Sequence, residues 1–408
     1  MTSMPERVIV LGGDGFCGWP TALDQSKRNR HVVIVDNFAR RGADDELDIR
    51  SALPVAPLEE RIRAWKRVTG RSLGFHEFDI ATDPGRLEEL FSAFQPDVII
   101  HFAEQRSAPY STLSPDHQRA TIANNVAATH NVLLSMARAC PEAHLVHLGS
   151  VGVYGYRTRA WETPEGYLTA RVAGFEGEDV EIDVLHPFEP VSPYHLTKCM
   201  DSQMFEFYAR TDRLRITDLH QGIVWGSQTP LTSMAEALWN RVDVDAIYGT
   251  VINRFLYQAI TGEPLTVYGT GRQTRGVIHL RDAIRCIELS IRNPPASGER
   301  VRIRNQVAET LSVQNVGRAI SSETGSAMEY VPNPRGEPSS NDLHVNNDSL
   351  RRLGFEPSLF ADTVHSELQT WRRMTESALN RAGGGRRVEG HPGVGEPGAD
   401  GVRSTPLR

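Results

Sequence analysis

Tyr194 and Lys198, four residues apart, are the side chains of this sequence best suited to chemistry. In a helix they lie on one face, so the lysine ammonium can lower the pKa of the phenol. Ser150 precedes them at the end of an apolar segment, where its hydroxyl can bond the same substrate oxygen. This set predicts proton removal from a sugar alcohol while a nicotinamide accepts the hydride, and Tyr194 and Lys198 are also expected to contact the cofactor. His195 is a further candidate acid or base, although a histidine at a helix start is equally often structural.

A glycine turn precedes this set. Gly12, Gly15 and Gly18 lie between an apolar strand expected at residues 7–11 and a helix expected at 19–27. Glycines there allow a tight turn and let backbone N–H groups approach a pyrophosphate at the helix start. Phe16 and Cys17 belong to the same turn, so all five residues are predicted to border a dinucleotide.

An acidic residue closes the next apolar segment, residues 31–35. Asp36 can accept hydrogen bonds from both hydroxyls of the adenosine ribose and would repel a 2′-phosphate, which favours NAD over NADP. Asn37 follows Asp36 and is also expected to border the cofactor. Arg40 and Arg41 lie close enough in sequence that one of them could contact a 2′-phosphate, so NADP stays an alternative. Further along the chain, Asp79 and Ile80 follow an expected strand and either meet the adenine ring or are an ordinary loop pair.

The strands and helices needed to position these residues alternate along the chain. Apolar segments at 97–102 and 144–148 predict strands, and residues 86–94, 123–139 and 194–209 predict helices. Strands that are apolar throughout and alternate with helices predict a Rossmann-type, doubly wound parallel sheet over residues 5–225, an α/β fold. Asn124 and Asn125 near one helix start either shape the active-site backbone or cap the helix.

The pattern changes after residue 226. A helix near 250–261, a short strand at 265–268 and a glycine-rich turn at 269–276 predict a smaller mixed α/β substrate domain over 226–380. The segment 46–72 contains a plausible amphipathic helix at 58–68. Residues 382–408 are rich in Gly, Pro and Arg and are expected to be a disordered tail.

Composition excludes several functions. A formal charge of −7 argues against nucleic acid as the main partner, and no apolar segment is long enough to cross a membrane. The four cysteines show no metal-ligand or disulfide spacing, so no metal site is predicted and the thiols are expected to be reduced, as in a cytoplasmic protein.

Taken together, these motifs resemble the extended short-chain dehydrogenase/reductase family, with its NAD-dependent epimerases and dehydratases. Within that family, the similarity is greatest to the UDP-sulfoquinovose synthases. It is carried by the segments 12–19, 35–37, 101–111, 194–198, 253–255, 265–269, 273–276 and 332–335. The segment 101–111, His-Phe-Ala-Glu-Gln-Arg-Ser-Ala-Pro-Tyr-Ser, is far more specific than any glycine pattern.

The resemblance implies a reaction of UDP-glucose, NAD and sulfite. NAD oxidises the C4 hydroxyl with Tyr194 as base, the C4 ketone acidifies the C5 proton, water leaves from C6, sulfite adds there, and hydride returns to C4. The nucleotide sugar is expected to contact Arg106, Gln221, Asn253, Thr266, Tyr268, Arg275 and Arg335. Guanidinium groups bind oxyanions bidentately, so Arg106 and Arg275 suit sulfite or diphosphate. The resemblance also implies a homodimer built on paired helices.

One position departs from the family pattern. Residues 149–155 are Gly-Ser-Val-Gly-Val-Tyr-Gly, and Val153 stands where the family has a glutamate. The 4,6-dehydratases carry an Asp-Glu pair where this chain has Val151 and Gly152. An NDP-hexose 4-epimerase, which needs only oxidation, sugar rotation and reduction, or an atypical dehydratase is therefore the alternative, and a non-catalytic NAD sensor is a minor one.

Overall fold

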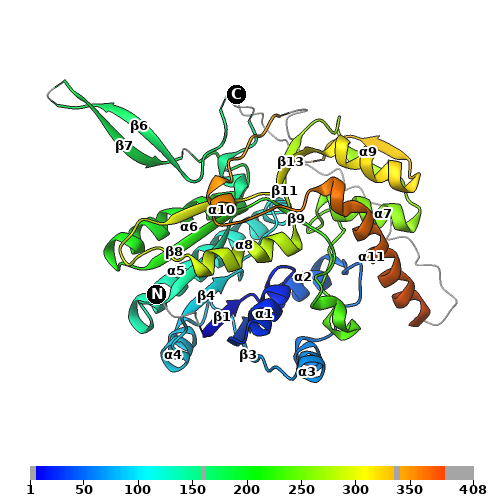
Figure 1. Ribbon diagram of the computed structural model, residues 1–408, viewed down its shortest axis with the longest axis horizontal. Coiled ribbons are helices and arrows are strands. Elements are labelled where there is room, and N and C mark those ends of the chain that lie inside the picture. The colour runs from blue at the N-terminus through cyan, green and yellow to red at the C-terminus, as the bar shows by residue number, and fades with distance from the viewer. Residues whose placement is uncertain (1–5, 158–160, 176, 187, 335–340, 382–408) are drawn as a thin grey trace.

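A seven-stranded sheet forms the centre of the protein, whose computed structural model describes residues 6–157, 161–175, 177–186, 188–334 and 341–381 (Figure 1). The strand order is β12-β8-β5-β4-β1-β2-β3, and every neighbouring pair is parallel. The strands are β1 (Arg7–Leu11), β2 (His31–Asp36), β3 (Gly74–Glu77), β4 (Val98–His101), β5 (His144–Ser150), β8 (Arg215–Gln221) and β12 (Arg302–Gln306). The predicted doubly wound parallel sheet is confirmed.

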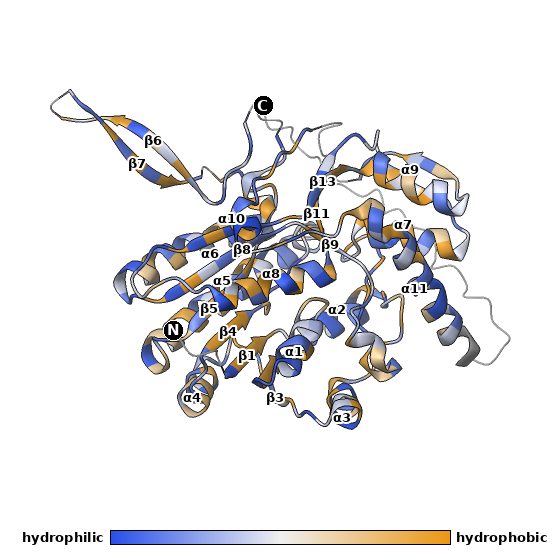
Figure 2. Cartoon of the chain, viewed as in Figure 1, coloured by the Kyte–Doolittle hydropathy of each residue, from blue (hydrophilic) through white to orange (hydrophobic). Residues whose placement is uncertain are grey.

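Helices cover both faces of the sheet, which explains why the central strands are apolar along their whole length (Figure 2). One face packs against α4 (Pro84–Phe94), α5 (Pro115–Ala139) and α6 (Pro193–Thr211). The other packs against α1 (Gly18–Lys27), α3 (Leu58–Thr69) and α8 (Leu280–Arg292). The expected amphipathic helix at 58–68 is α3, whose buried Leu58 and Trp65 pack in this second layer.

Helix α5 begins earlier than the sequence suggested. The expected start near residue 123 is wrong, because the helix begins at Pro115 and is capped by Ser114, which accepts a hydrogen bond from the His117 N–H at 3.3 Å. Serine followed by proline is a favourable helix start. The first turns are mostly polar and partly exposed, so they show no apolar periodicity.

A second unit follows β8. Its helices α7 (Val251–Thr261), α9 (Val313–Thr324) and α11 (Phe360–Arg381) surround a core that includes Phe255, Val316 and Trp371. Two small sheets join it: β10 (Leu265–Tyr268) with β14 (Met328–Val331), and β13 (Glu309–Ser312) with β11 (Thr274–His279) and β9 (Ile223–Trp225). Between these elements the chain returns to the large sheet with α8 and β12, so the two units interleave along the sequence. The remaining helices are α2 (Ala39–Leu47), α10 (Asp348–Arg352), η1 (Tyr110–Thr112), η2 (Val151–Tyr154), η3 (Thr232–Met234) and η4 (Glu236–Leu238).

A hairpin projects from the body beyond η2 (Figure 1). Among the described residues, its strands β6 (Tyr167–Ala173) and β7 (Asp179–Leu185) pair only with each other, in antiparallel register. Val172, Val180 and Ile182 are exposed on it. The sequence analysis did not predict this hairpin.

Two further observations concern predicted features. No helix in the described ranges is long and apolar enough to cross a membrane. Cys17, Cys140, Cys199 and Cys286 are free thiols. The expected disordered tail, 382–408, and Arg335 lie outside the described residues.

Candidate functional site

The glycine turn forms a close-fitting cradle at the carboxyl end of β1. Gly12 has a φ of 82°, and its N–H donates to the Val35 carbonyl at 2.7 Å. A Cβ at Gly12 would lie 2.8 Å from the Ala103 backbone nitrogen, and one at Gly18 would lie 2.0 Å from the Gly12 carbonyl oxygen. Only glycine fits at these two positions, so backbone N–H groups at the start of α1 stay open to a dinucleotide phosphate.

The end of β2 supplies the carboxylate of this site. Asp36 accepts hydrogen bonds from the backbone N–H groups of Asp14 and Phe38, both at 2.8 Å. Burial and the neighbouring Asp14 raise the pKa of Asp36 to about 6. Next to it, the Asn37 side chain accepts a hydrogen bond from the Ala39 N–H at 3.0 Å. Asp36 is therefore held at the strand end, where a ribose would meet it.

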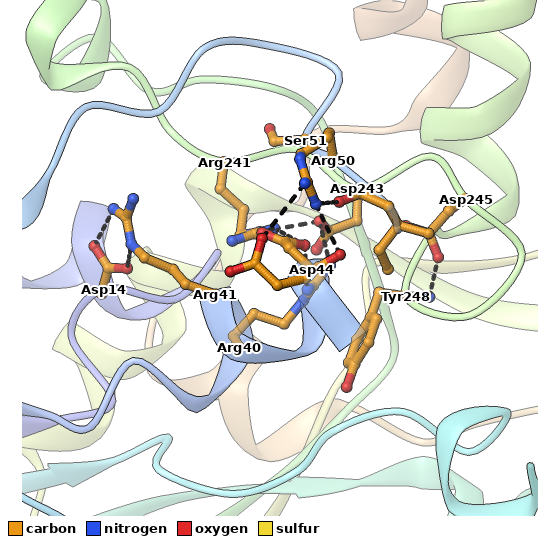
Figure 3. A network of polar contacts seen from close by, with 12 residues as sticks. Asp14, Arg40, Arg41, Asp44, Arg50, Ser51, Arg241, Asp243, Asp245 and Tyr248 are labelled. Carbon is orange, nitrogen blue, oxygen red and sulfur yellow. Dashed lines mark hydrogen bonds and ion pairs between the residues drawn. The ribbon is translucent and has the colours of Figure 1, made fainter. Parts of the chain in front are cut away.

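The arginines after β2 are engaged by carboxylates (Figure 3). Arg41 lies 2.6 Å from Asp14. Arg40 lies 2.6 Å from Asp44 and 2.8 Å from Asp243. Neither guanidinium is free to receive a 2′-phosphate in this arrangement, which fits NAD.

Other predicted cofactor residues contribute mainly to the core. Phe16 packs in an apolar cluster with Ile278, and Ile80 lies in the main core. Asp79 accepts a hydrogen bond from the Ala81 N–H at 2.8 Å. Phe16 and Ile80 therefore contribute to packing, whereas the second carboxylate oxygen of Asp79 has no hydrogen-bond partner among the described residues and can still meet an adenine ring.

Helix α6 positions the catalytic candidates. Ser192 caps it by accepting a hydrogen bond from the His195 N–H at 3.2 Å, and one helical turn separates Tyr194 from Lys198. The Ser150 side chain, at the end of β5, lies close enough to the Tyr194 phenol to act on its pKa. Burial raises the pKa of Tyr194, while the Lys198 charge and the Ser150 side chain act to lower it. The three residues that the sequence grouped thus meet at the carboxyl edge of the sheet.

A buried polar cluster surrounds Lys198. Its Nζ lies 2.7 Å from a Glu104 carboxylate oxygen, 3.1 Å from His147 Nε2 and 3.6 Å from an Asp201 oxygen. His147 Nδ1 lies 2.8 Å from Asp218. The sequence analysis missed these four residues, although polar residues within otherwise apolar strands, such as His147 and Asp218, were an available signal.

Asn125 ties this cluster to the surrounding elements. Its side chain accepts from the Gln105 N–H at 2.8 Å and donates to the Gln105 carbonyl at 2.9 Å and the Thr197 hydroxyl at 3.0 Å. Because α5 begins at Pro115, Asn125 lies within the helix and does not cap it. It shapes the loop after β4 and joins it to α6, the first of the two predicted roles.

His195 lies against the backbone of η2. Its Nδ1 lies 3.0 Å from the Ser192 hydroxyl, and a Cβ at Gly152 would overlap its Nε2 at 2.2 Å. Burial and the nearby Arg275 lower the pKa of His195 to about 4, so the imidazole is neutral at pH 7. Glycine at position 152 therefore makes room for a neutral imidazole beside the site.

The two predicted anion-binding arginines approach from different sides. Arg275 lies over the Tyr156 ring at 4.6 Å and donates to the Thr274 carbonyl at 2.8 Å. Arg106 lies 2.5 Å from Asp243. Burial raises the pKa of Cys17, in the glycine turn, to about 12, and the charge of nearby Arg106 acts against that increase. Arg275 therefore borders His195, whereas Arg106 borders the cofactor turn.

The remaining predicted substrate residues are anchored by protein contacts. The Gln221 amide donates to Gln306 at 2.7 Å, and Asn253 accepts from the Gly226 N–H at 2.9 Å. Thr266 accepts from the Gln258 amide at 2.9 Å, and the Tyr268 ring lies 4.2 Å from the Arg254 guanidinium carbon. Gln221 pairs with Ser150 across β5 and β8, whereas the other three belong to the second unit.

Val153, the departure from the family pattern, is fully buried. It packs in an apolar cluster with Tyr154, Cys199 and Val307. Its carbonyl accepts a hydrogen bond from the Glu189 N–H at 2.9 Å. The side chain at this position is part of the packing and offers no acid or base.

Comparisons with known proteins agree with this geometry. Residues 8–304 match the NAD dependent epimerase/dehydratase family. The UDP-sulfoquinovose synthase of Spinacia oleracea chloroplasts is 42% identical over 89% of this chain and 74% of its own length. A UDP-sulfoquinovose synthase of Sulfolobus acidocaldarius is 37% identical over 86% of this chain and 88% of its own length.

The crystal structure of the UDP-glucose 4-epimerase of Thermotoga maritima with UDP-glucose has the same fold, with a TM-score of 0.67, 20% identity and coverage of 90% and 99% of the two chains. The chain therefore belongs to the NAD dependent epimerase/dehydratase family and is an NAD-dependent nucleotide-sugar enzyme.

Proposed function

We propose that this protein makes a sulfonated sugar nucleotide from UDP-glucose and sulfite. Two of its relatives carry the name UDP-sulfoquinovose synthase, which supports this proposal. The observation that carries the proposal is the meeting of Ser150, Tyr194 and Lys198 beside a glycine cradle that admits a dinucleotide. The relatives match over most of both chains, including the part that follows the dinucleotide half.

The first step is proton transfer at the sugar C4 hydroxyl. Gly12, Gly18 and Asp36 would hold NAD, which would supply the hydride acceptor for the oxidation and the hydride for the later reduction. Tyr194 takes the hydroxyl proton, and Ser150, which lies close enough to the phenol to act on its pKa, orients the same oxygen. The positive charge of Lys198 lowers the cost of forming the phenolate.

Later steps use the groups beside Tyr194. A C4 ketone acidifies the C5 proton, and His195, neutral at pH 7, is able to accept it. The C6 hydroxyl then leaves as water with the proton that His195 accepted, and hydrogen sulfite adds through sulfur at the electrophilic C6 carbon while its proton returns to C5. Arg275 lies close enough to His195 to lower its pKa, and its guanidinium suits the sulfite oxygens.

Sulfite dependence tests this proposal. The purified protein is incubated with UDP-glucose and NAD, with and without sulfite, and the products are followed by mass spectrometry and NMR. We expect a sulfonated sugar nucleotide only when sulfite is present. Sugar masses that sulfite leaves unchanged, across several nucleotide sugars, contradict the proposal.

A 4-epimerase is the second candidate, and the buried Val153 favours it, because that position holds no carboxylate for the elimination. Epimerisation needs only oxidation, rotation of the keto sugar and reduction. The same incubation distinguishes the two: interconversion of UDP-glucose and UDP-galactose without sulfite supports the epimerase.

We further propose a homodimer in the cytoplasm that pairs α5 and α6 with those of a second copy. Leu196, Met200 and Phe207 are 44%, 37% and 51% exposed on α6, at spacings that bring them to one helical face. Large apolar side chains gathered on one exposed face indicate a protein contact. The free thiols suit a reducing compartment.

A Phe207→Asp variant tests the dimer. Burying an unpaired carboxylate in an apolar contact is costly, so the variant is expected to be monomeric when its mass is measured by light scattering. Val68→Asp, the same apolar-to-carboxylate change at an exposed residue on α3, is the control and should keep the wild-type mass. A monomeric wild-type protein contradicts the proposal.

A further inference from the structure

Two buried carboxyl groups flank the ammonium of Lys198, and they are not equivalent. Glu104, from the loop after β4, lies 2.7 Å from Nζ, and its other oxygen lies 3.1 Å from His147 Nε2. The Thr129 hydroxyl also donates to this second oxygen at 2.9 Å. Asp201, on α6 itself, lies 3.6 Å from both Nζ and His147 Nε2, and neither of its oxygens has a hydrogen-bond partner among the described residues.

These contacts decide which carboxyl group carries the charge. A buried carboxylate is stable when hydrogen bonds and a close cation compensate for its lost hydration, and Glu104 has both. Asp201 lacks these hydrogen bonds, and the negative charge of the nearby Glu104 disfavours a second negative charge on it. Burial and the Glu104 charge raise the pKa of Asp201 to about 8, whereas Lys198 and His147 hold the pKa of Glu104 well below its usual range. At pH 7 the counterion of Lys198 is therefore Glu104.

The cluster has the composition of a metal site but is filled by the lysine. One ligand atom from each of Glu104, His147 and Asp201 lies within 4.8 Å of the others. Nζ of Lys198 lies within 3.6 Å of all three residues and is almost completely buried. The three side chains therefore surround one fixed ammonium, and a metal ion would have to displace it.

We propose that Glu104 is a positioning residue for the catalytic pair: its carboxylate fixes Lys198 Nζ in place and balances its charge beside Tyr194. This inference rests on the roles proposed above for Tyr194 and Lys198. His147, held by Asp218, lies 3.1 Å from the second Glu104 oxygen and helps to fix this carboxylate. Glu104 acts through Lys198 and is not proposed to touch the substrate.

The sign of the effect on Tyr194 follows from the charges that face it. Lys198 favours the phenolate, and the Glu104 charge opposes it; the Ser150 side chain and the Tyr156 phenol are the other groups that act on this residue. Glu104→Gln removes the opposing charge, while the neighbouring Asp201 is free to ionise and keep Lys198 charged. Ionisation of Tyr194 should therefore shift to lower pH by about one unit.

The test combines a titration with turnover. Tyrosinate absorbance is followed against pH for each protein, and the curve of the same protein carrying Tyr194→Phe is subtracted to isolate Tyr194. In E104Q we expect the Tyr194 midpoint to be lower by about one pH unit. We also expect kcat to fall about tenfold with KM unchanged, because Nζ is no longer fixed, a loss within the range of a general-base contribution. Glu104→Asp keeps the charge but shortens the side chain, so it should lower kcat and leave the midpoint in place.

Asp201→Asn is the matched control. It is the same isosteric exchange at the same ammonium, but Asp201 is not among the groups that act most strongly on the pKa of Tyr194, so the Tyr194 midpoint should match the wild type. An E104Q midpoint equal to that of D201N overturns the proposal, as does a kcat in E104D equal to the wild-type value. If E104Q does not fold, judged by circular dichroism, E104D decides. The titration needs no substrate, so a protein that turns over no nucleotide sugar contradicts the proposed function without affecting this test.

Discussion

Tyr194→Phe is expected to reduce hydride transfer from the nucleotide sugar to NAD by about 10²–10⁴-fold, the range typical of a lost general base. The phenol lies near Ser150 and one helical turn from Lys198, and phenylalanine cannot accept the proton of the C4 hydroxyl. NAD binding should be unchanged, because the glycine cradle and Asp36 lie on other elements. The checks are NADH formation by absorbance in a single turnover and NAD affinity by calorimetry.

Tyr208→Phe is the control for that variant. Tyr208 lies on the same helix and is also largely buried, and its hydroxyl lies 3.2 Å from His130 on α5, away from the catalytic cluster. Removing this hydroxyl should lower the melting temperature slightly and leave hydride transfer at the wild-type rate. Full activity of Tyr194→Phe contradicts the assigned base, and equal losses in the two variants indicate a structural effect of either change.

Gly18→Ala is expected to weaken NAD binding by about ten- to a hundredfold, the equivalent of about 1–3 kcal/mol of overpacking. The added Cβ would lie 2.0 Å from the Gly12 carbonyl oxygen and 2.9 Å from the Gly13 Cα, both parts of the backbone, so the turn itself must shift. The N–H groups that approach the pyrophosphate lie in this turn. Calorimetric titration with NAD gives the affinity, and the melting temperature without NAD reports the cost to the fold.

Gly85→Ala is the matched control, since Gly85 lies in helix α4 and an added Cβ there meets no heavy atom within 4 Å. Alanine is favoured over glycine in a helix by about 1 kcal/mol, so the variant should melt no lower than the wild type and should bind NAD equally well. Wild-type NAD affinity in Gly18→Ala would mean that the turn does not form the dinucleotide site.

The strands of the large sheet could be predicted because each is a short apolar segment followed by turn residues. Both faces of a parallel sheet are buried, so its strands carry continuous apolar runs that local composition reveals. Apolar composition did not reveal the start of α5, because the first turns are polar and the helix start is marked only by Ser114 and Pro115. It also failed to reveal the β6–β7 hairpin, whose strands are largely exposed and carry no continuous apolar run.

The candidate site was predictable in part, since it lies where strands end. Gly12 follows β1, Asp36 ends β2 and Ser150 ends β5, and the carboxyl ends of parallel strands meet at one edge. Tyr194 and Lys198 were recognisable because one helical turn relates them. The substrate residues of the second unit could be placed only by resemblance, because their relation to the sheet depends on how two units pack.

By itself, the sequence determined the doubly wound sheet, the dinucleotide turn and the Ser150, Tyr194 and Lys198 set, because each depends on local spacing or on strand ends. Only the tertiary structure decided what surrounds Lys198. Glu104 and His147 come from different segments of the chain, and packing brings them together around Lys198. Their distances make Glu104 the counterion of Lys198 and leave Asp201 uncharged. Electrostatic interactions of buried groups depend on distances of a few ångströms, and no pattern along the chain specifies those.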